Sequence, residues 1–219
     1  MNQNESVLKG YQDPDDYDEF LSAKSLKAKL LCRIAWGFKD FSHASDLLNG
    51  LSDDFDGSLL DVPAGSGLFT WKKYSRLKKA KITCVDYSPY MLEKASRVFK
   101  EASINNVEFV QGDVGNMQFE DESFDIVLSM NGFHVFPDKD VAFNEILRVL
   151  KQGGLFIGCS YVREVRKVTD KFVDGFFVPR CLFTPPFQTK QEFYDMLAKN
   201  YSKVEFETVG AVACYHCVK

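Results

Sequence analysis

The chain has 219 residues, 45% hydrophobic and 26% charged, a composition typical of a globular protein with one sizeable core. Its 27 basic and 31 acidic side chains give a net charge of −4 without a long basic block, so nucleic acid and membrane surfaces are weak partner candidates. No apolar run approaches the roughly 20 residues of a membrane span, and the polar residues 1–5 are unlike a signal peptide. We expect a cytoplasmic protein with reduced cysteines.

Residues 1–54 predict helices that come before any strand. From Tyr17 to Gly37 apolar residues recur at three- and four-residue spacing, and a second helix is expected at 42–51. Because this segment precedes the strand–helix alternation, it must pack outside the sheet or cover the ligand cleft. Its aromatic residues Tyr11, Tyr17 and Trp36 are candidates to close an acceptor pocket, and burial in the core is the alternative for each.

An apolar strand that ends in Asp61 leads into a loop of small residues and then into a helical pattern. This arrangement delivers backbone N–H groups to a ligand. A dinucleotide fingerprint would need a third glycine where Thr70 stands, and Asp61 would repel a pyrophosphate. The same carboxylate suits S-adenosylmethionine (SAM), which carries an ammonium and a sulfonium but no phosphate. Because Pro63 fixes its own φ near −65°, positive φ should fall on Gly65 and Gly67.

The next unit consists of a helix at 68–77 and a strand at 81–85 that ends in Asp86. Ser88 and Pro89 then start another helix as N-cap and first helical residue. A carboxylate at the end of this second strand can accept both hydroxyls of a ribose. The alternative for Asp86 is an ordinary turn aspartate.

The third and fourth strands are expected at 107–110 and 124–129. Ligands of open α/β sheets lie at the carboxyl ends of the strands beside the point where the strand order reverses, here between the first and fourth strands. Residues 129–134 therefore face the reactive end of the ligand. Asn131 is placed to contact its amino-acid end. His134 is a candidate general base, and a hydrogen-bonded structural histidine is the alternative.

The last third of the chain predicts a helix, a strand, a variable segment and a terminal hairpin. The variable segment, 161–188, is rich in phenylalanine and is expected to build part of an acceptor pocket; a capping box at Thr189–Glu192 starts the helix that follows. The other expected elements are a helix at 138–150 stopped by 153–154, a strand at 155–160, and antiparallel strands at 203–208 and 211–218.

Cys214 and Cys217 have the C-x-x-C spacing found in metal and redox sites. They lie in an apolar run that predicts a strand, where residues three apart face opposite sides of the sheet. We therefore favour a structural role for both and expect no metal.

These motifs, in this order, resemble class I SAM-dependent methyltransferases over about residues 55–160, with Pro63 in place of the first loop glycine. The resemblance implies a doubly wound, Rossmann-like α/β fold with a seven-stranded, mostly parallel sheet, an antiparallel C-terminal hairpin and an N-terminal helical cover. It also implies that Asp113 accepts the adenine amino group beside Val114. The residues that carry the resemblance are Asp61, Gly65, Gly67, Asp86, Asp113 and Asn131.

The expectation is a single domain that transfers a methyl group from SAM to a small molecule by in-line displacement, leaving S-adenosylhomocysteine. Its parts are a helical cap (1–54), a SAM-binding core (55–160), an acceptor-side insertion (161–190) and a terminal helix and hairpin (191–219). A SAM-binding partner subunit without transferase activity and an NAD-dependent oxidoreductase are the alternatives. Expected cofactor contacts are Asp61, Ala64, Gly65, Gly67, Asp86, Tyr87, Met91, Asp113, Val114, Met130 and Asn131. Expected acceptor-pocket residues are Tyr11, Tyr17, Trp36, Phe133 and Phe183, with His134 as the catalytic candidate.

Overall fold

The computed structural model describes residues 33–38 and 42–219. Two of the expected acceptor-pocket residues, Tyr11 and Tyr17, lie outside this part of the chain, as does most of the expected helical cap. Within the described ranges, no helix has the length and apolar character needed to cross a membrane.

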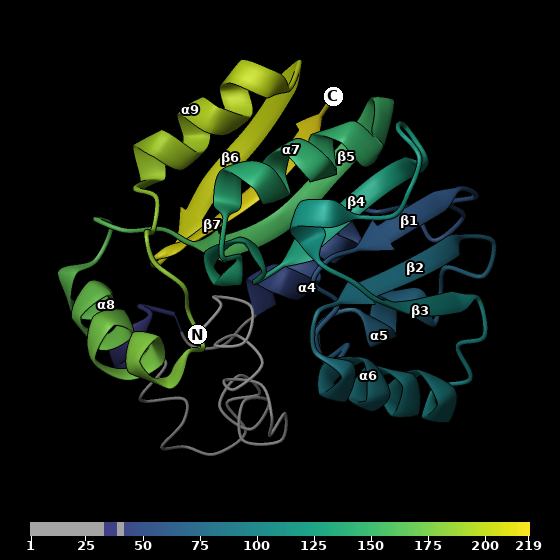
Figure 1. The fold of residues 1–219 in the computed structure, drawn as a ribbon, viewed down its shortest axis with the longest axis horizontal. Helices are drawn as coiled ribbons and strands as arrows, with labels where there is room; N and C mark the ends of the chain where they lie inside the picture. The colour runs from purple at the N-terminus through teal and green to yellow at the C-terminus, as the bar shows by residue number, and fades with distance from the viewer. Residues whose placement is uncertain (1–32, 39–41) are drawn as a thin grey trace.

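A seven-stranded sheet with the order β3-β2-β1-β4-β5-β7-β6 forms the centre of the molecule (Figure 1). The first five strands are parallel, and β7 runs antiparallel to both β5 and β6. This topology confirms the predicted mostly parallel sheet with an antiparallel terminal hairpin, and it places the reversal of strand order between β1 and β4. The strands are β1 (Ser58–Asp61), β2 (Lys81–Asp86), β3 (Val107–Gln111), β4 (Phe124–Met130), β5 (Leu150–Tyr161), β6 (Lys203–Val209) and β7 (Val212–Val218).

Helices cover the sheet, so its central strands are buried. In Figure 1, α7 and α9 lie in front of the sheet and α4 lies behind it. No surface is exposed at Leu59 and Leu60 of β1 or at Val127 of β4. This burial on both faces explains why the sequences of these strands are continuous apolar runs. The helices are α4 (Ser42–Asn49), α5 (Trp71–Tyr74), α6 (Pro89–Glu101), α7 (Lys139–Val149), α8 (Lys167–Phe172) and α9 (Lys190–Asn200).

Helices α6 and α9 begin where their capping residues predicted, and α7 is capped by Asp138, which the sequence analysis did not name as a cap. The Ser88 hydroxyl accepts the Met91 N–H at 3.4 Å at the start of α6, and a carboxylate oxygen of Asp138 accepts the Val141 N–H at 3.0 Å at the start of α7. At α9, Thr189 and Glu192 form the expected capping box. Each cap satisfies an N–H that has no partner inside its helix.

Two elements differ from the expectation. The helix predicted at 68–77 is the single turn α5, because residues before Thr70 are used in the turns of the loop, where the Thr70 N–H donates to the Gly67 carbonyl at 3.2 Å. Strand β5 begins at Leu150 rather than at 155. Gly153 does not stop the preceding helix but lies inside the strand with a φ of +73°, and its N–H donates to the Lys219 carbonyl at 2.9 Å.

The segment between β5 and α9 contains α8, a π-helical turn η3 (Val173–Phe177) and a 3₁₀ turn η4 (Val178–Arg180). Its aromatic side chains pack around Trp36. The ring centroid of Trp36 is 5.7 Å from that of Phe177 and 6.0 Å from that of Phe183. This packing ties residues 33–38 to the insertion and buries all three rings.

Candidate cofactor and acceptor site

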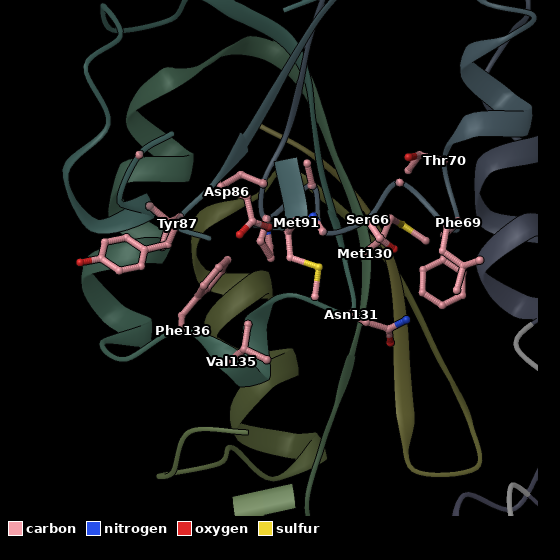
Figure 2. Close-up of a pocket in the computed structure, with 18 of the residues that line it drawn as sticks. Ser66, Phe69, Thr70, Asp86, Tyr87, Met91, Met130, Asn131, Val135 and Phe136 are labelled. Atoms are coloured by element: carbon pink, nitrogen blue, oxygen red, sulfur yellow. Dashed lines mark hydrogen bonds between the residues drawn. The ribbon is translucent and has the colours of Figure 1, made fainter. Parts of the chain in front are cut away.

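A pocket opens at the carboxyl ends of β1, β2 and β4, at the reversal of strand order (Figure 2). Its wall combines the loop after β1, the ends of β2 and β4, and the turns after β3 and β4. All expected cofactor contacts except Asp61 line it. The lining residues are Val62, Pro63, Ala64, Gly65, Ser66, Gly67, Leu68, Phe69, Thr70, Asp86, Tyr87, Met91, Gly112, Asp113, Val114, Met130, Asn131, Val135, Phe136 and Pro137.

The two loop glycines take positive φ, +56° at Gly65 and +73° at Gly67. Pro63, whose ring excludes positive φ, does not have to adopt it. The reasons for glycine differ between the two positions. A Cβ on Gly67 would lie 2.4 Å from Cε1 of Phe99, whereas a Cβ on Gly65 would meet no atom within 4 Å. Gly67 therefore serves packing against α6, and Gly65 keeps the wall of the pocket free of side-chain atoms.

Asp86 lines the pocket and is held by the backbone around it. Its Oδ2 accepts the Gly65 N–H and its Oδ1 accepts the Ser88 N–H, both at 2.8 Å. Burial raises the pKa of the Asp86 carboxyl to about 6, although these N–H groups favour its charged form. Each oxygen keeps a lone pair for a further donor, as recognition of two ribose hydroxyls requires.

Asp61 is buried between β1 and α5 and is absent from the described pocket wall. Its Oδ2 accepts the Tyr74 hydroxyl at 2.8 Å, and its Oδ1 has no hydrogen-bond partner among the described residues. Burial above all raises the pKa of Asp61; the Tyr74 hydrogen bond lowers it, the nearby charge of Asp86 raises it, and the net result is a pKa of about 7. The expected direct contact of Asp61 with the cofactor is therefore not supported by its position, because its carboxyl is directed to Tyr74 and not to the pocket.

The turn after β3 supplies the pair that the resemblance assigned to adenine. Asp113 accepts the Gly115 N–H at 2.9 Å and thereby caps the 3₁₀ turn η1 (Val114–Asn116). Val114 is buried beside it and lines the pocket, as do Tyr87 and Met91 from the start of α6. Figure 2 shows Asp86 and Tyr87 at the opposite end of the pocket from Thr70.

Met130 and Asn131 end β4 at the pocket. Asn131 has a φ of +55°, which a non-glycine residue seldom adopts, and its N–H donates to the Cys159 carbonyl at 2.9 Å. Its amide Oδ1 accepts the Cys159 thiol at 3.5 Å. Its Nδ2 is buried and has no hydrogen-bond partner in the described part of the chain.

His134 lies in the 3₁₀ turn η2 (Phe133–Val135), but its ring is buried away from the described pocket wall. Its Nδ1 accepts the Tyr161 N–H at 3.2 Å and lies 3.1 Å from the Ser160 hydroxyl, so the neutral ring carries its proton on Nε2. Burial, with a smaller contribution from the Lys139 cation, lowers the pKa of His134 to about 3. These contacts favour the structural alternative over the general base.

The three described residues expected in the acceptor pocket also lie elsewhere. Trp36 and Phe183 belong to the buried aromatic packing of the insertion, and Phe133 packs between helices, 5.2 Å from the ring centroid of Phe193. The apolar wall is instead built by residues that the sequence did not single out. These are Leu68, Phe69, Val135, Phe136 and Pro137.

The charge of the pocket fits SAM better than a dinucleotide. Among the described lining residues, Asp86 and Asp113 are the only charged side chains, so no cation is available for a pyrophosphate. The loop offers backbone rather than side chains where a ligand would pass, and Asp86 offers free lone pairs. The residues present therefore fit a nucleoside that carries positive charge.

Comparison with known proteins shows which domain the central part of the chain resembles. A family model described as a methyltransferase domain matches residues 59–154. The demethylmenaquinone methyltransferase of Lactococcus lactis is 35% identical over 140 residues, which cover 64% of this chain and 51% of that protein. Residues 59–154 thus match a methyltransferase domain, the class of protein that the sequence motifs resemble.

Solved structures similar to this chain share its fold. YcgJ of Bacillus subtilis is 26% identical with a TM-score of 0.63, over 76% of this chain and 70% of that chain. A Thermotoga maritima structure, described as a SAM-dependent methyltransferase and possible histamine N-methyltransferase, is 20% identical with a TM-score of 0.68, over 97% and 98% of the two chains. The chain spans about half the length of the Lactococcus protein.

Proposed function

We propose that this methyltransferase transfers a methyl group from SAM to a small, uncharged aromatic acceptor of the quinol class, with S-adenosylhomocysteine as the second product. The observation that carries the proposal is a pocket at the reversal of strand order, with the hydroxyl-binding Asp86 at one end and the apolar Phe69 and Val135 in its wall. The quinol class is supported by the name of the Lactococcus relative and by the absence of basic side chains from the described pocket wall.

The chain's residues divide the binding of SAM among them. Asp86 accepts the ribose hydroxyls, while Asp113 accepts the adenine amino group beside the apolar surface of Val114. Gly65 lets the cofactor pass close to the backbone, because no Cβ projects there. When bound, SAM supplies a methyl group already activated by its sulfonium.

The protein's contribution to the reaction is then mainly positioning. Holding the acceptor in line with the methyl group in a pocket without bulk water can supply about 7–11 kcal/mol of the barrier. Phe69 and Phe136 are suited to hold a flat ring by apolar contact. His134 is not needed as a base in this scheme. In methylation of a ring carbon, the quinol would supply the electron pair for the new C–C bond, the S–CH₃ bond would break to leave S-adenosylhomocysteine, and the proton lost from the ring carbon would pass to water.

Calorimetry and product analysis test the proposal together. SAM and S-adenosylhomocysteine should bind at micromolar concentration, and NAD should not. Incubation with methyl-labelled SAM and 1,4-dihydroxynaphthalene, kept reduced without oxygen, should give a labelled methylated product by mass spectrometry. Binding of SAM without any product would favour the partner-subunit alternative, and binding of NAD in place of SAM would favour the oxidoreductase.

A further inference from the structure

The Asn131 side chain, which follows β4, combines deep burial, an unused donor and a place in the pocket wall; the buried Ser129 hydroxyl, also without a partner among the described residues, does not line the pocket. Asn131 is 9% exposed and lines the pocket, and its Nδ2 has no hydrogen-bond partner among the described residues. Leaving a buried donor unpaired costs about 1–3 kcal/mol. A ligand that supplies an acceptor atom there would remove this penalty on binding.

The Cys159 thiol determines which end of the amide is available. Its Sγ donates to Oδ1 of Asn131 at 3.5 Å, and the Cys159 carbonyl accepts the Asn131 N–H at 2.9 Å. Burial raises the pKa of the Cys159 thiol well above its usual range, so the S–H donor is retained at all physiological pH values. The amide oxygen is thereby occupied, and Nδ2 is left as a donor.

The surroundings indicate what kind of oxygen this donor would meet. Figure 2 shows Asn131 at the same end of the pocket as Phe69 and Thr70, away from Asp86 and Tyr87. Both charged side chains of the described pocket wall, Asp86 and Asp113, belong to the nucleoside contacts. A neutral donor among apolar walls suits a hydroxyl or carbonyl oxygen better than a fully charged carboxylate, which would lack a counter-charge.

We propose that Asn131 is the residue that positions the acceptor: its Nδ2 donates a hydrogen bond to a ring oxygen of the acceptor, with the amide held in that orientation by the Cys159 thiol. This inference rests on the proposed function and specifies it further. The acceptor must carry an oxygen next to its reactive carbon, and the donor makes that oxygen a condition for productive binding. The alternative role for Nδ2 is to bind the methionyl carboxylate of SAM.

Two substitutions suit the left-handed backbone at this position. Asn131→Gly removes the side chain, and Asn131→Asp replaces the donor by an acceptor of the same shape; glycine and aspartate both tolerate a φ of +55°. Cys159→Ala releases the amide oxygen, and Cys159→Ser keeps an O–H donor as the matched rescue. Circular dichroism melting curves identify any variant that loses its fold.

The test measures ligand affinity in the presence of saturating S-adenosylhomocysteine. The probes are 1,4-dihydroxynaphthalene, kept reduced, and naphthalene, which has the same rings without oxygen. Asn131→Gly should weaken binding of the dihydroxy probe roughly tenfold, about 1.4 kcal/mol, while naphthalene binding changes less than about twofold. Asn131→Asp should bind the dihydroxy probe more weakly still. Cys159→Ala should lose less affinity for this probe, and Cys159→Ser should bind it as wild type does. In turnover with the same probe, KM should rise more than kcat falls.

The outcomes separate the two proposals. If the substitutions weaken the binding of S-adenosylhomocysteine roughly tenfold, Asn131 contacts the cofactor rather than the acceptor, and the inference is overturned. Equal affinity of wild type and variants for the dihydroxy probe, with methylation intact, overturns the inference alone. Failure of the wild type to bind or methylate the probe while SAM still binds overturns the quinol class, and this inference with it.

Discussion

Asp86 shows how the backbone prepares a carboxylate for a ligand. The loop after β1 and the turn after β2 each direct one N–H at it, from Gly65 and Ser88. These bonds fix the carboxylate plane and leave one lone pair on each oxygen. Because burial raises its pKa only to about 6, the group is mostly ionised at neutral pH. Asp86 therefore joins the glycine loop to β2, at the place proposed for the ribose.

Replacement of Asp86 by asparagine should disturb both the contact with the loop after β1 and the binding of the cofactor. The new NH₂ group must face one of the two backbone N–H groups, because both carboxylate oxygens are in use. We expect the Kd of S-adenosylhomocysteine to rise at least tenfold, about 1.4 kcal/mol, by calorimetry. Glu108→Gln, which removes an exposed carboxylate from the neighbouring β3, is the matched control and should leave Kd unchanged. An unchanged Kd in Asp86→Asn would place the ribose elsewhere.

Asp61→Asn should make the free protein less sensitive to pH. Burial raises the pKa of Asp61 from 3.8 to about 7, so between these values the folded chain holds a proton that the unfolded chain has lost. The stabilising contribution of that proton is complete below about pH 4 and is lost as the pH rises through about 7. We expect the free energy of unfolding of Asp61→Asn to exceed that of wild type at pH 8, by at most about 4 kcal/mol, and to approach it at pH 4 to 5. Urea unfolding at both pH values measures this.

Asp125, whose pKa is shifted in the opposite direction to that of Asp61, provides the control. At Asp125, burial alone would raise the pKa, but hydrogen bonds from Lys151 and Ser58 outweigh it and hold the pKa below its usual value. Asp125→Asn should therefore lose stability at pH 8. If Asp61→Asn were less stable than wild type at both pH values, the Tyr74 hydrogen bond would matter more than the buried charge.

The end of an apolar run predicts which residues lie at a strand end, but not where each side chain points, since Asp61 at the end of β1 is directed to Tyr74. Asp86 and Asn131 also lie at strand ends, and both line the pocket. The position of His134 was not predictable, because three neighbouring residues of one turn point to different sides and only tertiary contacts with Ser160 and Tyr161 decide where the ring goes. The apolar wall carried no chemical signature at all.

The loop between β1 and α5 depends on two glycines for different reasons, which gives a matched pair of substitutions. Gly67→Ala would place a Cβ 2.4 Å from Phe99 in addition to the strain of a φ of +73°. Gly65→Ala adds only the strain of positive φ, about 1–2 kcal/mol, because its Cβ meets no atom within 4 Å. We expect Gly67→Ala to be the more destabilised in chemical unfolding. Gly65→Ala should retain its fold but bind S-adenosylhomocysteine at least tenfold more weakly, since the methyl group would enter the pocket. Equal stability of the two variants would contradict the packing role of Gly67.

At the scale of elements, capping residues and apolar runs predicted most starts and ends correctly. These local signals failed where backbone groups form hydrogen bonds with the loop or with a distant segment instead of within the expected element. The helix expected at 68–77 is short because Thr70 and its neighbours close the loop, and Lys73 is buried with its ammonium on the Leu51 carbonyl and Asp53. Strand β5 starts early because Leu150 pairs with Phe124 of β4 and Gly153 hydrogen-bonds Lys219 beside β7. Such long-range pairing is not visible in a local pattern.

The whole molecule is a sheet to which the insertion between β5 and α9 is attached at the pocket. Thr184 of that insertion donates its N–H to the His134 carbonyl at 3.1 Å. The Lys139 ammonium, at the start of α7, donates to the carbonyls of Thr184 at 2.7 Å and Phe136 at 3.1 Å, and it lies 5.6 Å from the Phe187 ring centroid. Lys139 thus joins the insertion to a residue of the pocket wall. The order of strands followed from the resemblance, but this attachment joins segments far apart in sequence and had no sequence signal.

Lys139→Met should detach the insertion while leaving the sheet intact. Methionine fills a similar volume but donates no hydrogen bond, so the links to Thr184 and Phe136 are lost together. In hydrogen exchange, we expect amides of residues 181–188 to exchange roughly tenfold faster, about 1.4 kcal/mol of local opening. Lys151→Met, which removes a half-exposed lysine paired with Asp125, should not change that segment. The exchange rates of amides in β3, at the far edge of the sheet, separate local from global effects. If these amides also exchanged roughly tenfold faster, Lys139 would stabilise the whole fold rather than the attachment of the insertion.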